Sequence, residues 1–292
     1  MPNSEFYGTT RNIKDDGMKY LDMHVHCDST DKAQLDILAK TARDSETVLA
    51  LSGGLRYGGH DFAPNETVVE ICKQYPDCFV PLAKLDLWET ADPAEVYRYA
   101  EMGVKGFKCI YPYYEYDHDI YMPVYEAAQK CNLPILFHTG NYRPCDDDTI
   151  YRRPVLKNMQ PINLDRICRA FPKLHVVMAH LGTRIFEQQA SQFLGMLPNL
   201  YADLAGNAHF ARLTGADMLA MLCNDIRLVD PNRNSLGKIV LGSDSYVTRP
   251  GIMAEAQGYY EHIFHRVGVP QDLFDAIMGK TAASWMGVSL ED

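Results

Sequence analysis

The feature that most constrains the fold is an alternation of short apolar runs with amphipathic stretches, repeated eight times along the chain. The apolar runs, rich in β-branched and aromatic residues, cover 20–26, 47–53, 78–86, 104–110, 134–140, 174–180, 200–206 and 238–245. The stretches between them, such as 31–44 and 122–132, carry apolar residues at i, i+3 and i+4 spacing, which is typical of helices with one buried face. Strands that alternate with helices predict an α/β protein with a parallel sheet. Eight such units favour closure into a single (β/α)8 barrel, the TIM barrel.

Nothing in the sequence divides this barrel from a second domain. The 292 residues contain no low-complexity run, charge block or Gly/Ser-rich linker, so we expect one domain over 1–292. It would have a short polar extension at 1–18 and additional C-terminal helices over about 253–288. An open, doubly wound sheet is the alternative, but no G-x-G-x-x-G follows the first run. The glycine-rich segment 51–59 lacks that spacing and is expected to form a loop.

Composition limits the expected partners and location. The chain has 28 Lys+Arg and 38 Asp+Glu, a net charge of −10, and this negative field disfavours nucleic acid as a partner. No apolar run approaches the roughly 20 residues needed to cross a bilayer, and no signal peptide is recognisable at the start. The eight cysteines form no C-x-x-C pair. We therefore expect reduced thiols and a cytoplasmic protein that does not bind membranes.

Polar residues occur in these apolar runs near their carboxyl ends. His24 and His26 close the first run, and because side chains alternate across a strand they share one face. His138, His180 and Asp244 stand near the ends of the fifth, sixth and eighth runs, at the edge where barrel enzymes place their active sites. A single histidine at a strand end is usually a hydrogen-bonded structural residue. Five such groups in one phase predict a site for Zn²⁺, Mn²⁺ or Fe²⁺.

This order of histidines and aspartate resembles the pattern of the amidohydrolase superfamily. The surrounding segments are similar to its amidohydrolase-related branch, which also contains the aminocarboxymuconate-semialdehyde decarboxylase-like proteins. The resemblance spans about residues 20–288 and is carried by LDMHVH, GVKGFKCIYPYY, VYEAAQKCNLPILFHTG, VVMAHLG, VLGSDSY and AIMGKTAASWMGV. The chain departs from the family at Gly279-Lys280, where members often have an Asn.

The resemblance implies a mononuclear metal site and a division of roles among its residues. It implies one divalent ion, most simply zinc with manganese or iron as alternatives, held by His24, His26, His138 and Asp244. It also implies that His180 polarises the substrate or moves a proton. Asp244 would act as the general base as well as touching the metal.

Several residues near these strand ends are candidates for binding the substrate. Lys108 ends the fourth run, where some superfamily members carry a carboxylated lysine that bridges two metals. A bridging, a structural and a substrate-binding role are all open, and we favour an ammonium that binds a substrate carboxylate. Guanidinium groups bind carboxylates bidentately, and tyrosines either line a pocket or pack on the barrel rim. The further candidates on this side are Arg56, Arg143, Tyr111 and Tyr113.

These observations lead to three hypotheses about function. The first is a metal-dependent hydrolase acting on an ester, lactone or amide bond of a small, anionic, carboxylated substrate. The second is a metal-dependent, non-oxidative decarboxylase of an aromatic or unsaturated acid; the chain length of 292 residues favours the compact hydrolases over it. The third is a barrel that binds metal or ligand without turnover, which the presence of His180 and Asp244 disfavours. The sequence leaves open the substrate, the number of metal ions and the oligomeric state, a homodimer being one option.

Overall fold

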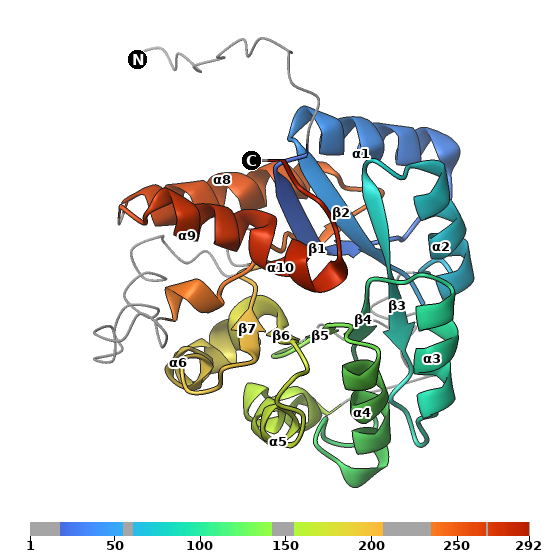
Figure 1. The fold of residues 1–292 in the computed structure, drawn as a ribbon, viewed down its shortest axis with the longest axis vertical. Coiled ribbons are helices and arrows are strands. Elements are labelled where there is room, and N and C mark those ends of the chain that lie inside the picture. The colour runs from blue at the N-terminus through green and yellow to red at the C-terminus, as the bar shows by residue number, and fades with distance from the viewer. Residues whose placement is uncertain (1–17, 55–60, 142–154, 207–234, 267, 292) are drawn as a thin grey trace.

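A computed structural model of the chain describes residues 18–54, 61–141, 155–206, 235–266 and 268–291. Within them, eight parallel strands form one curled sheet in the order β7-β6-β5-β4-β3-β2-β1-β8, with helices between the strands (Figure 1). This arrangement confirms the predicted TIM barrel. The strands are β1 (Tyr20–His26), β2 (Thr47–Ser52), β3 (Phe79–Leu85), β4 (Gly106–Cys109), β5 (Ile135–Phe137), β6 (Val176–Met178), β7 (Leu200–Ala202) and β8 (Ser245–Tyr246).

The helices begin close to where their sequence signals place them. Asp31 accepts a hydrogen bond from the backbone of the first turn of α1, and Asp92 does the same for α3, which has proline at its first position. The helices α8 to α10 confirm the expected C-terminal additions and lie together beside β1 (Figure 1). The helices are α1 (Lys32–Asp44), α2 (Asn65–Gln74), α3 (Pro93–Glu101), α4 (Met122–Lys130), α5 (Leu164–Ala170), α6 (Thr183–Leu194), α8 (Gly251–Arg266), α9 (Gln271–Asp275) and α10 (Thr281–Met286).

The eighth run differs from its prediction, because regular pairing covers only Ser245–Tyr246 rather than most of 238–245. Asp244 has a φ of 61°, which takes the chain out of the extended conformation just before β8. Residues 239–241 nevertheless contact both β7 and β1: Val240 N donates to the carbonyl of Ala202 at 2.9 Å, and Met23 N donates to the carbonyl of Leu241 at 3.1 Å. We call the segment 239–246 the seam, because it joins β7 to β1 and closes the ring.

An apolar layer fills the barrel interior at the amino ends of the strands. It contains buried side chains from five strands and from the seam, and Ala282, Ala283 and Met286 of α10 pack against them. The chain end also returns to this side, since Glu291 N donates to the carbonyl of Met18 at 2.9 Å. The histidines of the predicted site lie beyond this layer, towards the carboxyl ends of the strands. The strand and seam members of the layer include Leu21, Val48, Leu82, Leu136, Val177 and Val240.

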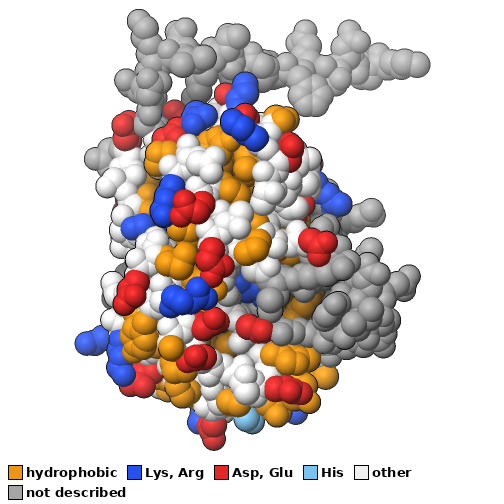
Figure 2. Space-filling view, turned by 90° about the vertical axis from the view of Figure 1, so that its right-hand side faces the viewer, with side chains coloured by type: hydrophobic (Ala, Val, Ile, Leu, Met, Phe, Trp, Pro, Cys, Tyr) orange, Lys and Arg blue, Asp and Glu red, His pale blue; other side chains and the backbone are white. Residues whose placement is uncertain are grey.

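The surface carries charges of both signs. Acidic and basic side chains are interspersed on the face shown in Figure 2, and several form local pairs such as Lys32–Asp36 and Arg43–Asp77. Among the described helices, none has the length and apolar character needed to span a bilayer. The six cysteines in the described part of the chain are free thiols.

Candidate metal centre

Three of the four predicted metal ligands meet at the junction of β1 and the seam. The Nε2 atoms of His24 and His26 lie 3.4 and 3.0 Å from Oδ1 of Asp244, and all three side chains are buried. These nitrogen and oxygen donors form a group that could hold a metal ion. The predicted sharing of one face by His24 and His26 is therefore confirmed.

The local backbone explains how Asp244 reaches the two histidines. Its left-handed conformation is one that aspartate tolerates better than most residues, and its N–H donates to the carbonyl of His24 at 2.9 Å. Burial by itself raises the pKa of Asp244. The hydrogen bond with His26 and the neighbouring imidazoles of His24 and His180 outweigh that effect and hold the pKa well below its usual range. Asp244 is therefore an ionised carboxylate.

His138 and His180 extend this group from β5 and β6. His180 Nδ1 lies 3.0 Å from the carbonyl of Ala205, and His180 Nε2 lies 3.3 Å from His138 Nδ1. A carbonyl only accepts, so His180 carries its proton on Nδ1 and its Nε2 accepts from His138 Nδ1–H. This leaves His138 Nε2 without a proton, and that buried atom has no hydrogen-bond partner. A buried nitrogen whose lone pair has no hydrogen-bond partner is a suitable ligand for a bound cation.

A strained turn presents His180. Residues 180–183 all have positive φ, between 47 and 80°, although only Gly182 adopts such angles without cost. The hydroxyl of Thr139 donates to the carbonyl of Ala179 at 2.6 Å and accepts from Gly182 N at 3.1 Å. Thr139 follows His138 directly, so the chain after β5 supplies both an imidazole and the hydroxyl that holds this turn.

Lys108 is fully buried in the same site, on β4. Its Nζ lies 2.7 Å from Nε2 of His24, so the ammonium faces the candidate metal centre. Burial lowers the pKa of Lys108 to about 8, against the opposing charges of Asp244 and Asp203. The structure thus places a cation within contact of a predicted metal ligand.

The structure separates the two candidate tyrosines. Tyr111 is buried, and its ring centre lies 6.0 Å from that of His138. Tyr113 is 40% exposed and packs edge-on against Trp88, so its ring contacts lie on the barrel rim. The candidates Arg56 and Arg143 lie outside the described residues.

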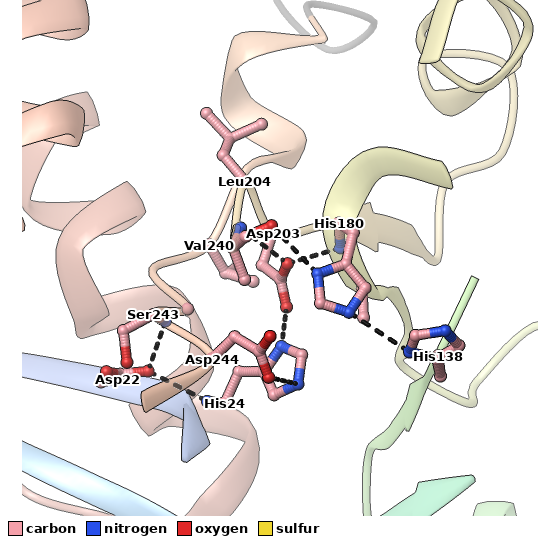
Figure 3. Close-up of polar contacts among 12 residues, drawn as sticks. Asp22, His24, His138, His180, Asp203, Leu204, Val240, Ser243 and Asp244 are labelled. Atoms are coloured by element: carbon pink, nitrogen blue, oxygen red, sulfur yellow. Dashed lines mark hydrogen bonds and ion pairs between the residues drawn. The ribbon is translucent and has the colours of Figure 1, made fainter. Parts of the chain in front are cut away.

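Sequence reasoning missed two buried carboxylates in this site. Asp203 follows β7, and its Oδ2 lies 2.8 Å from Nδ1 of His24 (Figure 3). Asp22 lies on β1, and its Oδ1 accepts from the backbone N–H groups of His24 and Ser243, both at 3.0 Å. Asp22 thereby stabilises β1 where its pairing with β2 shifts register, between Asp22 and Val25. It also joins β1 to the seam. A carboxylate inside each apolar run was the signal that could have identified both residues.

The fold and the site together define a (β/α)8 barrel with histidines and carboxylates gathered at the carboxyl ends of its strands. The family model described as Amidohydrolase matches residues 22–288, and the chain belongs to this family. The resemblance seen in the sequence is thereby confirmed.

Solved structures show the same fold at low sequence identity. An uncharacterized TIM-barrel protein from Bordetella bronchiseptica has a TM-score of 0.64 at 15% identity, covering 92% of this chain and 99% of that one. Dihydroorotase from Campylobacter jejuni has a TM-score of 0.55 at 18% identity, with 94% and 84% covered. A dihydroxybenzoic acid decarboxylase from Polaromonas sp. JS666, with bound manganese and 2-nitroresorcinol, has a TM-score of 0.55 at 15% identity, with 92% and 96% covered. No curated protein matches the chain in sequence.

Proposed function

We propose that this chain is a metal-dependent hydrolase that acts on an ester, lactone or amide bond of a small carboxylated substrate. The observation that carries the proposal is the burial of electron-rich donor atoms around one point. Nε2 of His24, Nε2 of His26 and Oδ1 of Asp244 all lie within 4.8 Å of one another.

The contacts of the two β1 histidines support a cation at this point. His24 Nδ1 faces the carboxylate of Asp203, and His26 Nδ1 lies 3.3 Å from the hydroxyl of Ser52, which itself donates to a backbone carbonyl. Burial lowers the pKa of both imidazoles, so each is neutral, and each offers a lone pair on Nε2 when its proton lies on Nδ1. With both protons on Nδ1, the two Nε2 lone pairs and the Asp244 carboxylate would repel one another. The Lys108 ammonium at Nε2 of His24 offsets part of this repulsion, and a metal ion at this point would offset it further.

The donor set suits a divalent ion. Neutral imidazoles and a carboxylate bind Zn²⁺, Mn²⁺ and Fe²⁺, and we propose His24, His26, His138 and Asp244 as the ligands, with zinc as the first candidate. An ion held there supplies Lewis acidity, which makes water nucleophilic near neutral pH and polarises a carbonyl oxygen.

The chain's own groups would then guide the substrate and the proton. The ionised Asp244 accepts a proton from the attacking water. His180 is anchored through Nδ1 to the Ala205 carbonyl, so its Nε2 is the atom that would take this proton from Asp244, in place of its contact with His138, and pass it to the leaving group. The buried ammonium of Lys108 would bind the substrate carboxylate, with Tyr111 forming an apolar wall beside His138.

Decarboxylation is the second candidate, and Lys108 is the observation that favours it. A cation beside His24 would bring a substrate carboxylate next to the metal ligands, where carbon dioxide would leave and a proton would take its place. Chain length does not separate the two reactions, because the chain covers 96% of the Polaromonas decarboxylase and 84% of the dihydroorotase.

Metal content tests the proposal first. Elemental mass spectrometry on protein purified without chelator should find about one divalent ion per chain in the wild type. The His24→Ala/His26→Ala double variant should bind little metal. The matched control is His262→Ala/His265→Ala, which removes two exposed histidines of α8 and should keep the metal. Equal metal content in all three proteins would remove the proposed site, as would a wild type that stays metal-free after reconstitution.

Substrate screening then separates the two reactions. Carboxylated esters, lactones and amides would be assayed by acid release, and aromatic and unsaturated acids by carbon dioxide release. Asp244→Asn should abolish whichever activity is found, because an amide cannot accept the proton. Full activity in that variant would refute the assigned role of Asp244.

A further inference from the structure

The turn after β7 holds two of the site histidines through one side chain. Asp203 is fully buried and receives three N–H groups: His24 Nδ1 on Oδ2 at 2.8 Å, and the backbone N–H groups of His180 and Ala205 on Oδ1 at 2.7 and 3.0 Å. Figure 3 shows this carboxylate between the two imidazoles. Asp203 therefore links β1, the turn after β6 and its own turn.

The neighbours of His24 permit only one arrangement of its ring proton. A carboxylate receiving two backbone N–H groups acts as an acceptor, so the Asp203 contact requires a proton on His24 Nδ1. On the other side of the ring, the amino group of Lys108 donates to His24 Nε2 at 2.7 Å. Two independent partners, one an acceptor and one a donor, thus specify the same tautomer.

We propose that Asp203 is a positioning residue that holds His24 as its Nδ1–H tautomer, with Nε2 turned to the metal centre, and fixes the turn that carries His180. The expected effect of Asp203 on metal affinity rests on the proposed function, whereas its effect on the tautomer of His24 does not. Partners that orient a ligating histidine in this way typically change metal affinity by about 10–100-fold when they are removed.

The variant Asp203→Asn tests whether Asp203 orients His24 or only fills the space beside it. The amide has nearly the same shape, and its oxygen can still accept from the backbone N–H groups of His180 and Ala205. Its NH2 group would then face His24 Nδ1, and two donors cannot share one hydrogen bond. We expect the ring proton of His24 to move to Nε2, which removes the lone pair from the metal centre.

The tautomer is measured on metal-free protein labelled with 15N-histidine, by long-range 1H–15N correlation of the ring nitrogens. A His24→Ala spectrum assigns the signals. The wild type should show His24 with its proton on Nδ1, and Asp203→Asn should show it on Nε2. Competition with a coloured chelator for Zn²⁺ should then give about 10–100-fold weaker binding for Asp203→Asn.

Asp22→Asn is the matched control, because Asp22 is also a fully buried carboxylate in this site. Its bonded oxygen accepts from the backbone N–H groups of His24 and Ser243, which an amide oxygen can replace. The control should therefore keep the tautomer and bind Zn²⁺ within about threefold of the wild type, a change well below that expected for Asp203→Asn.

Several results would overturn the proposal. These are a wild-type His24 protonated on Nε2, an unchanged tautomer in Asp203→Asn, or equal losses of Zn²⁺ affinity in the two variants. The wild-type spectrum alone decides the first point even where Asp203→Asn does not fold. A wild type that binds no metal but shows Nδ1–H on His24 and the shift in Asp203→Asn would refute the proposed function while supporting the role of Asp203.

Discussion

We predict that the hydroxyl of Tyr260 contributes more to stability than any other single polar group that closes the barrel ring. Tyr260 reaches from α8 to the gap between β7 and the seam, where its hydroxyl accepts from Leu204 N at 2.6 Å and Gly242 N at 3.3 Å and donates to the carbonyl of Val240 at 3.0 Å. The side chain is fully buried. Tyr260→Phe keeps the aromatic ring and removes these three hydrogen bonds, together with a longer contact to the carbonyl of Gly242 at 3.4 Å.

The expected cost follows from the groups left without a partner. A buried backbone group that loses its partner costs about 1–3 kcal/mol. The long contact to Gly242 contributes least, so we expect Tyr260→Phe to lower the free energy of unfolding by about 3–4 kcal/mol. The assay is urea unfolding followed by far-UV circular dichroism on metal-free protein.

Tyr125→Phe provides the comparison. Tyr125 is equally buried but donates one hydrogen bond, to the carbonyl of Tyr116 at 2.8 Å. We expect this variant to lose about 1–1.5 kcal/mol. If the two variants lose the same stability, the reasoning that Tyr260 closes the ring by satisfying three backbone groups is refuted.

Three further predictions concern other buried polar groups. Burial raises the pKa of Glu187 from 4.5 to about 7, so the folded state binds more protons and stability falls as pH rises through that window. Glu187→Gln should therefore stabilise the protein by about 1–3 kcal/mol at pH 8 but not at pH 4 in urea titrations, and an equal effect at both pH values would contradict this. Thr139→Val should lower the free energy of unfolding by about 2–4 kcal/mol and reduce any activity that depends on His180. Thr139→Ser should keep most of the stability and of the activity, because it retains the hydroxyl that holds the turn. Asn65→Ala should lower the melting temperature, because the Asn65 amide bonds both the N–H and the carbonyl of Lys84 at 2.9 Å; Glu66→Ala, which breaks an exposed ion pair with Arg98, should change it little.

Much of the architecture could be predicted from sequence because it rests on local patterns. The spacing of apolar residues in 31–44 predicts a helix, and α1 covers Lys32–Asp44. The run 20–26 predicts a strand, and β1 has those bounds. The run 238–245 shows where such patterns fail, because the positive φ of Asp244 and the contacts of the seam depend on what lies across the ring.

The site was predictable to the extent that strand periodicity decides which side chains face inward. That rule placed His24 and His26 on one face, where they meet Asp244. It could not place Tyr113, since a rim loop has no fixed period and the ring packs against Trp88 instead. Strand periodicity also could not predict the strained turn that positions His180, because no local pattern specifies four consecutive residues with positive φ.

The amino-acid sequence by itself determined that this chain alternates strands and helices and carries its histidines and Asp244 at strand ends, because both features follow from the spacing of residue types. Only the tertiary structure decided which of these groups touch. Asp203 and His24 are 179 positions apart in the sequence, and they meet because ring closure brings the turn after β7 against β1. The tautomer of an imidazole depends on the partner it finds there, and that partner is set by packing rather than by local sequence.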